Sequence, residues 1–243
     1  MTRPNAETDR TVLRISGADT RDFLQNLVTN DVDRLDDGPV YTALLTPQGK
    51  LIADFLMVPE GSDVLIDVAT AWAAGLKQRL TMYKLRAAVT VEETALKVKR
   101  GTGEAPEGAV IDPRNPALGW RLYGDEGGDD GSDWDAIRVA QGVPASGVEL
   151  GPDSYILEVG FEKLNGVDFK KGCYVGQEVT ARMKHKTELK KGLRIVRIDG
   201  DAPVGTEITR DGKVVGTLFT TAGDAALAYL RFDRIGDGMT ADG

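Results

Sequence analysis

The sequence predicts a mixed α+β fold that is followed by a small antiparallel β-sheet or barrel. Up to His185, short strand-like runs alternate with amphipathic helical patterns. After His185 the pattern changes to strand-like runs that are divided by glycine turns. A chain of 243 residues is long enough to bury a sizeable core in one large domain or in two. We therefore expect a body over residues 1–189 and a second, β-barrel domain over residues 190–243.

The first hundred residues contain several strand-like runs of β-branched, aromatic and other apolar residues. Two of them are joined by Thr46-Pro47-Gln48-Gly49, a tetrapeptide that is typical of a tight turn. The expected strands are residues 12–15, 41–45, 51–58, 64–68, 89–91 and 96–98.

Four helices are predicted in the body, the last of which begins at Gln177. Asp19 can cap the first, and the third runs from Trp134 to Gln141, with Ser132 or Asp133 as its cap and Gly142 as its end. The apolar face of the first helix carries Phe23, Leu24, Leu27 and Val28, and that of the second carries Trp72, Leu76, Leu80 and Tyr83. Both stripes have helical spacing, so we interpret them as core-facing surfaces rather than as binding sites.

Between Gly101 and Ser132 three prolines and a run of glycine and acidic residues interrupt the pattern. We interpret the run from Gly124 to Asp133 as a solvated loop; a calcium site is the alternative, although the run lacks the spacing and closing glutamate of a calcium loop. Four further strands are expected at residues 193–198, 207–209, 213–219 and 226–230, and residues 236–243 are expected to fray.

Composition excludes several classes of protein. The net charge of −8 gives no general attraction to nucleic acid or to an anionic membrane, so direct binding to either is not expected. Residues 1–10 are polar and do not resemble a signal peptide, and no apolar run approaches the roughly 20 residues of a membrane-spanning helix. One cysteine fits a reducing compartment, and the predicted location is the cytoplasm.

The single cysteine lies in the most informative segment, Lys170-Lys171-Gly172-Cys173-Tyr174-Val175-Gly176-Gln177-Glu178. A lone cysteine is often a small apolar filler. Here, however, lysines and glycines surround it, and a helix is expected to begin just after it. Cationic side chains and the N–H groups of a helix N-terminus both favour a thiolate, which indicates a chemically tuned thiol.

The sequence restricts the role of Cys173. The one histidine, His185, is twelve positions away, and a helix between the two would separate them by about 18 Å, which argues against a Cys–His nucleophile pair. One cysteine and one histidine do not make a zinc site, and no intramolecular disulfide can form. A transient bond to another molecule, or a shared metal or cluster ligand across an interface, stays open.

The run Lys171-Gly172-Cys173-Tyr174-Val175-Gly176-Gln177-Glu178, followed by Ala181-Arg182, resembles the signature of the YgfZ-type folate-binding proteins. These proteins include a mitochondrial assembly factor for iron–sulfur proteins and belong to the superfamily of the glycine-cleavage T-protein, an aminomethyltransferase that uses tetrahydrofolate. The segments 23–31, 45–54 and 164–169 also resemble that superfamily. The resemblance implies an α+β body with ferredoxin-like subdomains around a central opening, and a small C-terminal antiparallel β-barrel.

The resemblance also implies a cofactor, tetrahydrofolate or a one-carbon derivative of it. A carboxylate can accept paired N–H bonds from the edge of a pterin. Asp54 ends the hairpin that resembles the T-protein segment with the catalytic aspartate; the alternative is an ordinary charge on a strand face. With Cys173, Asp54 is our candidate catalytic residue. The candidate cofactor-binding residues are Asp54, Arg138, Glu158, Lys171, Tyr174, Gln177, Glu178 and Arg182.

One departure from the aminomethyltransferases affects the expected function. Their Arg–x–Glu–Ala–Gly pattern matches Arg138-Val139-Ala140-Gln141-Gly142 here, so Ala140 occupies the position of the folate-contacting glutamate. Glu158 or Glu178 could compensate, although Glu178 could equally be a helix-start carboxylate. The lysines at 184, 186, 190 and 191 are interpreted as a solvated face, with contact to an anionic folate tail as the alternative.

Two classes of function follow from the resemblance. The first is a tetrahydrofolate-binding accessory protein for the assembly or repair of iron–sulfur enzymes, and through them for tRNA modification, with iron–sulfur proteins or their assembly machinery as partners. The second is a folate-dependent aminomethyltransferase or demethylase that acts on a small amine. A third interpretation is an interaction module that binds no small molecule. The intact cysteine motif and the missing glutamate favour the first.

Overall fold

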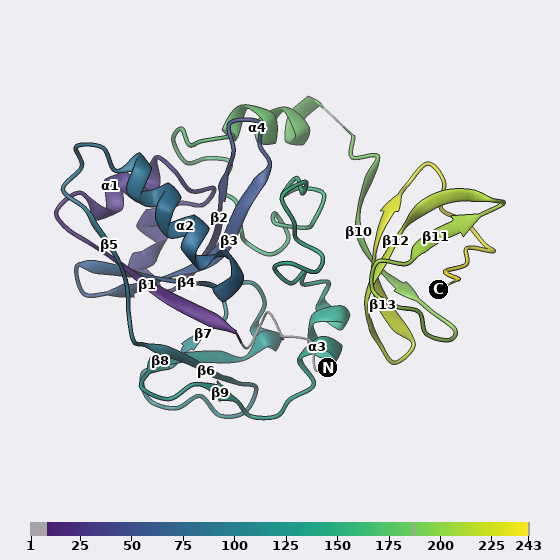
Figure 1. Ribbon diagram of the computed structural model, residues 1–243, viewed down its shortest axis with the longest axis horizontal. Helices are drawn as coiled ribbons and strands as arrows, with labels where there is room; N and C mark the ends of the chain where they lie inside the picture. Colours follow the sequence, from purple (N-terminus) through teal and green to yellow (C-terminus); the bar gives the residue numbers. More distant parts are fainter. Residues whose placement is uncertain (1–8, 187, 243) are drawn as a thin grey trace.

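The computed structural model describes residues 9–186 and 188–242 (Figure 1). Its first sheet has the strand order β2-β3-β4-β1-β5 and is antiparallel throughout. The strands are β1 (Arg10–Ser16), β2 (Val40–Leu45), β3 (Leu51–Glu60), β4 (Asp63–Ala69) and β5 (Thr90–Glu93). The predicted strands of this region are therefore confirmed, each longer by a few residues or shifted slightly. The turn at 46–49 is also confirmed, because Gly49 N donates to Thr46 O at 2.8 Å.

Two helices and a short 3₁₀ turn accompany this sheet: α1 (Thr20–Gln25), η1 (Val32–Asp36) and α2 (Thr70–Tyr83). The apolar residues predicted for both α-helices pack in a single core cluster. The first helix is shorter than predicted, because α1 ends at Gln25, and Leu27 and Val28 enter the core from the turn after it. The prediction that the Asp19 side chain caps α1 is wrong. Its carboxylate instead accepts from Ala88 N at 2.7 Å, which connects the start of α1 to the segment after α2.

A second sheet has the order β7-β8-β6-β9. Its strands are β6 (Lys97–Gly101), β7 (Val110–Ile111), β8 (Trp120–Gly124) and β9 (Gly128–Asp129), with the 3₁₀ turn η2 (Pro116–Leu118) between β7 and β8. The sequence did not predict β8, which lies inside the region interpreted as irregular. The acidic run is exposed as expected, but it adds β9 in parallel to β6. The carboxylate of Asp130 holds it there by accepting from Thr102 N at 2.7 Å.

Helix α3 (Trp134–Gln141) follows and has the bounds that the sequence predicts. Asp133 is its cap, because its side chain accepts from Ala136 N at 3.0 Å. Gly142 ends it in the left-handed conformation at φ 70°, which glycine adopts at little cost. From Gly142 to Gly176 the chain has no long helix or strand, and the helix α4 (Gln177–Lys186) then begins inside the cysteine motif.

The C-terminal strands β10 (Lys191–Arg197), β11 (Glu207–Arg210), β12 (Lys213–Ala222) and β13 (Ala225–Arg231) form an antiparallel sheet of order β10-β13-β12-β11. It lies to one side of the body, with α3 packed near β12 and β13 (Figure 1). The predicted strands are confirmed. The sheet is open, because β10 and β11 are its two edges and do not pair with each other.

The prediction of a frayed C-terminus is wrong for the described part of this segment. Thr240 and Thr209 exchange backbone hydrogen bonds of 2.8 and 2.9 Å along the edge of β11. Met239 and Ala241 pack on the apolar core of the sheet. The segment is thus held by pairing and burial that its glycine-rich sequence did not reveal. Across residues 9–186 and 188–242, no helix combines the length and the apolar character that crossing a membrane requires.

Candidate functional site

The cysteine motif is a loop that Lys171 anchors to the body. We call the hydrogen bonds of its Nζ to three main-chain carbonyls the clamp. Lys171 is 8% exposed, and its Nζ donates to Gln25 O at 2.8 Å, Val28 O at 2.6 Å and Asn30 O at 2.9 Å. An ammonium group has three N–H donors, and these three carbonyls use all of them. Burial lowers the pKa of Lys171 to about 8, while the charges of Asp31 and Asp168 act in the opposite direction. The clamp joins the motif to the turn that follows α1.

Asp168 fixes the approach to the motif. Its Oδ1 accepts from Lys170 N at 2.7 Å and from Lys171 N at 3.2 Å, and its Oδ2 accepts from Arg34 at 2.7 Å. Burial alone would raise the pKa of Asp168, but these hydrogen bonds and the positive charge of Arg34 hold it below the ordinary value of 3.8. The carboxylate therefore stays ionised and holds the two motif lysines in register with η1.

The second half of the motif sits directly on the hairpin between β2 and β3. Gly176 has φ 84°, and a Cβ atom at this position would lie 2.6 Å from Thr46 O. Gly49, at φ 76° in the hairpin turn, faces Val179 of α4 in the same way, since a Cβ there would lie 2.9 Å from the Val179 side chain. Tyr174 is buried in the core beneath the loop, and burial raises its pKa to about 12. Only glycine permits this close approach of loop and turn.

Cys173 is exposed, so the interpretation of this residue as an apolar filler is wrong. Neighbouring Gly172 is exposed as well, and its carbonyl accepts from the Gln177 side chain at 3.2 Å, which connects the residue before the cysteine to the start of α4. Of the two lysines before the cysteine, Lys170 is exposed and Lys171 is directed to the main chain below. Among the described residues no cluster of three or more His, Cys, Asp or Glu side chains is placed to hold a metal ion.

Helix α4 carries three of the candidate residues: Gln177 at its first position, Glu178 in its first turn and Arg182 one turn later. Glu178 and Arg182 are exposed. His185 stacks edge-on against Phe169, with ring centroids 6.4 Å apart, and Lys184 pairs with Glu162. The helix spans most of the segment between Cys173 and His185, as the argument against a Cys–His pair assumed.

Asp54 lies in the interior of the body, on β3, and is 3% exposed. Its Oδ1 accepts from Ser146 Oγ at 2.5 Å and its Oδ2 accepts from Tyr41 OH at 3.0 Å. A carboxylate can accept about four hydrogen bonds, so two acceptor positions remain after these contacts. A ligand that bonds to Asp54 must share the carboxylate with Ser146 and Tyr41 or displace one of them.

Arg138, on α3, is linked to Asp54 through Glu149 and the turn at 145–149. Its Nη1 lies 3.2 Å from Glu149 Oε2, and that same carboxylate oxygen accepts from Ala145 N at 2.8 Å, next to Ser146. Glu149 also accepts from the hydroxyl of Thr220 on β12 at 2.5 Å. The turn at 145–149 thus connects Asp54 on one side with Arg138 and the C-terminal sheet on the other.

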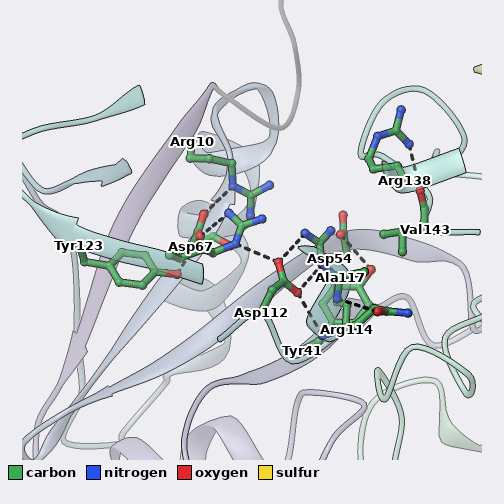
Figure 2. Close-up of polar contacts among 12 residues, drawn as sticks. Arg10, Tyr41, Asp54, Asp67, Asp112, Arg114, Ala117, Tyr123, Arg138 and Val143 are labelled. Carbon is green, nitrogen blue, oxygen red and sulfur yellow. Dashed lines mark hydrogen bonds and ion pairs between the residues drawn. The ribbon is translucent and has the colours of Figure 1, made fainter. Parts of the chain in front are cut away.

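A buried network of charges continues from Asp54 toward the second sheet (Figure 2). The Arg114 guanidinium lies 5.6 Å from the centre of the Tyr41 ring and pairs with Asp112 at 2.8 Å. Asp112 also accepts from Arg121 Nε at 3.1 Å, and Arg121 reaches Asp67 at 3.1 Å. The network therefore connects β3, the segment after β7, β8 and β4.

Asp67 is the end of this network and is fully buried. Arg10 Nε donates to it at 2.5 Å and Tyr123 OH at 2.9 Å, in addition to Arg121. Burial alone would raise the pKa of Asp67, but the charges of Arg10 and Arg121 outweigh it and lower the pKa below 3.8. Burial and the neighbouring Asp67 charge raise the pKa of Tyr123 well above 10. Asp67 therefore remains a carboxylate that joins the first sheet to the second.

Comparisons with known proteins show which family the chain resembles in sequence. The chain is 31% identical over 272 residues to the human iron-sulfur cluster assembly factor IBA57, mitochondrial; the match covers 93% of this chain and 76% of the human protein. The chain belongs to the family of these IBA57 proteins. It is also 32% identical over 218 residues to an IBA57 homologue from Mycosarcoma maydis, with 76% of this chain and 54% of that protein covered. The family described as CAF17, C-terminal beta-barrel domain, matches residues 190–243.

The fold of this IBA57-family chain also resembles a solved structure. A crystal structure of the glycine cleavage system aminomethyltransferase T from Bartonella henselae superposes with a TM-score of 0.71, over 93% of this chain and 77% of the other. Sequence identity between the two is 11%. The likeness confirms the predicted α+β class and the predicted similarity to the T-protein fold.

Within this IBA57-family fold, the predicted site residues fall into three groups. Cys173 shares one short segment with the candidate residues Lys171, Tyr174, Gln177, Glu178 and Arg182, of which Lys171 and Tyr174 are buried. Asp54 and Arg138 are joined through the 145–149 turn. Glu158 lies apart from both, at the junction with the C-terminal sheet, where it accepts from Tyr229 OH and pairs with Lys191 at 4.0 Å.

Sequence reasoning missed Ser146, Tyr41 and the network from Asp67 to Arg114. A signal was present for the carboxylates of Asp54 and Asp67, because each interrupts an apolar strand. A charge in a buried strand must be paired, and the pairing residues are then the ones to seek. The partners themselves come from distant segments and could not be identified from spacing.

Proposed function

We propose that this chain is an accessory factor for the assembly or repair of iron–sulfur enzymes. It binds tetrahydrofolate, or a one-carbon derivative, at Asp54 and uses Cys173 as an essential thiol. Membership of the IBA57 family supports the iron–sulfur role and partners among iron–sulfur proteins or their assembly machinery. Loss of such a factor would impair tRNA modification indirectly, because some tRNA-modifying enzymes depend on iron–sulfur clusters.

The observation that carries the proposal is the exposed Cys173 on an otherwise anchored loop. Lys171, Asp168 and Gly176 fix the main chain on both sides of the thiol, while the thiol itself faces solvent. A thiolate is the form of cysteine that attacks or ligates, and access to a partner is required for both. The arrangement suits a thiol that meets an atom presented by another molecule.

The folate part of the proposal rests on Asp54. A pterin presents N–H donors along one edge, and Asp54 keeps acceptor capacity beyond its bonds to Ser146 and Tyr41. Tetrahydrofolate, when bound, supplies a nitrogen that carries one-carbon units. The Asp54 carboxylate would hold the pterin edge, and Tyr41 and Ser146 would orient the carboxylate. Arg138 acts through Glu149 and the 145–149 turn rather than by reaching the ligand itself.

Two measurements test the proposal separately. Titration calorimetry with tetrahydrofolate should show binding by the wild-type chain and a large loss in Asp54→Ala, while Asp153→Ala, an exposed acid, should bind like wild type. Equal binding by Asp54→Ala removes this residue from the site, and no binding by wild type removes the cofactor.

For the thiol, Cys173→Ser should keep the fold and the folate binding but fail to complement a strain that lacks the gene. Full complementation by Cys173→Ser would show that the thiol is dispensable. Ser62→Cys is a useful companion, because it adds a thiol at an exposed position elsewhere and should not restore function to Cys173→Ser.

The second candidate is a folate-dependent aminomethyltransferase or demethylase that acts on a small amine, favoured by the likeness to the aminomethyltransferase T fold and by the buried, hydrogen-bonded Asp54. In this case Asp54 would orient or activate the folate nitrogen. An assay for folate-dependent methylene or formaldehyde transfer distinguishes the two, since only the second candidate requires turnover. The predicted cytoplasmic location stays a prediction, and the human relative is named as a mitochondrial protein.

A further inference from the structure

The open C-terminal sheet leaves part of its apolar core uncovered. A cavity of about 310 Å³ is lined both by the end of β10 and by the segment 239–242, which pairs with the edge of β11 (Figure 1). We call this place the edge gap. Two buried members of the sheet core, Ile208 and Leu218, line it. The partly buried apolar residues that pack on this core in residues 188–242 line it as well: Val196, Ile198, Ala202, Met239 and Ala241.

The main chain of β10 is open on the side that faces away from β13. In an antiparallel pair, every second residue directs its N–H and C=O groups to the partner strand, and the residues between direct theirs away. Leu193 is one that faces away, because its N–H donates to Glu158 O at 2.7 Å, and the register with β13 continues without a shift. Ile195 and Arg197 therefore also face away. In the described residues no main-chain group bonds to either of them on that side.

The segment 239–242 presents a second open edge. Thr240 and Thr209 exchange two main-chain hydrogen bonds, of 2.8 and 2.9 Å, so they form a hydrogen-bonded antiparallel pair. The neighbours Met239 and Ala241 then direct their N–H and C=O groups away from β11, while their side chains pack on the sheet core. Nothing in the part of the chain that the structure describes bonds to these groups. Two strand edges without a partner thus border the edge gap.

Acidic side chains line the same cavity. Asp199, Asp201 and Asp242 are exposed, and Arg197 is the one cation of the lining among the described residues. Arg197 already pairs with Asp224 at 3.3 Å. Within residues 188–242, Asp199 and Asp242 make no ion pair. The potential at the edge gap is therefore negative, which favours a basic occupant over an acidic one.

We propose that the edge gap binds an extended, basic segment of a partner protein as an added strand. The main chain of that segment pairs with β10 on one side and with the segment 239–242 on the other. Its apolar side chains enter the cavity at every second position, and its cationic side chains meet the carboxylates of the lining. An apolar small molecule fits less well, because both rows of main-chain groups would stay unpaired. The inference goes beyond the proposed function and depends neither on folate binding nor on Cys173.

Hydrogen exchange measured by NMR on the full-length chain tests the main-chain pairing directly. The probe is a ten-residue peptide in which valine and lysine alternate. Four amides should exchange at least tenfold more slowly at saturating peptide, because each gains an acceptor: those of Ile195, Arg197, Met239 and Ala241. The amide of Leu193, which is already bonded, is the internal control and should change little. The same peptide with glutamate in place of lysine should bind at least tenfold more weakly, and this preference should shrink as salt is raised.

Two N-methylated versions of the valine–lysine peptide test insertion between two edges without altering the protein. Methyl groups on the odd-numbered amides remove the donors along one side of the peptide, and methyl groups on the even-numbered amides remove those along the other. Each version should bind at least tenfold more weakly than the parent peptide. Asp199→Lys and Asp242→Lys should each weaken binding several-fold, whereas Asp237→Lys, the same reversal at an exposed acid outside the cavity lining, should not.

Four results with the peptides would overturn the proposal. These are the absence of binding, equal binding of the lysine and glutamate peptides, slowed exchange along one edge only, and full affinity of either N-methylated version. Slow exchange of the same four amides in the free chain that is lost on dilution would also overturn it, because the edge gap would then belong to an interface with a second copy of this chain.

Discussion

Replacement of Lys171 by methionine tests whether the clamp beneath Cys173 is the feature that orders the motif. Methionine keeps the length and apolar stem of lysine but donates no hydrogen bond. The carbonyls of Gln25, Val28 and Asn30 then lose their shared donor, and the bonds to Val28 and Asn30 are buried.

The expected loss of stability follows from these two buried acceptors. A buried carbonyl without a donor costs about 1–3 kcal/mol, so two cost about 2–6 kcal/mol. The variant no longer buries an ammonium charge, and the desolvation cost that it avoids offsets part of this loss. The net loss of stability is then about 2–4 kcal/mol. For a chain of this size that corresponds to a fall in Tm of about 4–16 °C. Lys170→Met, a change of the adjacent exposed lysine, is the matched control and should leave Tm nearly unchanged.

The pH dependence gives a second measure of the same substitution. Burial lowers the pKa of Lys171 from 10.5 to about 8. Between these values the unfolded chain holds the proton and the folded chain releases it, so the free energy of unfolding rises with pH in this window. Lys171→Met lacks this contribution. The difference in free energy of unfolding between wild type and variant should therefore be constant below about pH 7 and grow from about pH 8 to pH 10.5.

Denaturant unfolding at several pH values measures the difference, and hydrogen exchange of the amides at 169–176 reports whether the loop is released. Tm values equal to wild type or unchanged exchange in the loop would each refute the clamp, whereas a difference that shrinks with rising pH would refute the lowered pKa of Lys171.

The other predictions concern the glycine of the motif, the buried network and Asp54. Gly176→Ala should destabilise the chain by about 1–3 kcal/mol, because it combines a left-handed φ with a clash against the hairpin, while Gly172→Ala, which meets nothing within 4 Å, should be neutral in thermal unfolding. Asp67→Asn should cost about 3–5 kcal/mol in denaturant titration, because buried Arg10 loses its counter-charge and buried Arg121 keeps only that of Asp112. Since the pKa of Asp67 is lowered, its contribution to the free energy of unfolding is present above about pH 3.8 and should be lost below it. In Asp67→Asn the free energy of unfolding should therefore fall less steeply as the pH drops below 3.8. Ser146→Ala should bind tetrahydrofolate several-fold more weakly than wild type in calorimetry, because the Asp54 carboxylate loses the hydroxyl that orients it; tighter binding would show that Ser146 competes with the pterin instead.

The parts of the fold that follow local rules were predictable from the sequence. The helix from Trp134 to Gln141 was found with its cap and its end, because Asp133 and Gly142 carry signals that act over three or four residues. The hairpin around 46–49 and the C-terminal strands were found for the same reason. Strand β8 was missed because its neighbours are proline and glycine, and its position is fixed by pairing with β6, about twenty residues earlier.

The candidate site was predictable only in its exposed, contiguous part. The motif around Cys173 is specific because its glycines and lysine are required within one short loop. Asp54 was reached through a resemblance, but its partners Tyr41 and Ser146 come from β2 and from a turn ninety-two residues away from Asp54 in the sequence. Side-chain contacts of this range have no periodic signal. Asp19 shows the same effect, since its carboxylate was expected at a local cap and instead bonds to Ala88.

The motif divides into residues that hold the loop and one residue that is held. Lys171 and Tyr174 are directed inward and Gly176 touches the hairpin, so each contributes to stability. Cys173 is exposed, and an exposed thiol adds little to the folded state. This is why we propose that its anchored position serves contact with another molecule. Fixing a reactive side chain before a partner arrives reduces the entropy lost on contact, which is the advantage that a rigid presenting loop gives. On this reasoning Cys173→Ser and Lys171→Met fail for different reasons: the first retains the loop without its thiol, and the second retains the thiol on a loop that no longer presents it.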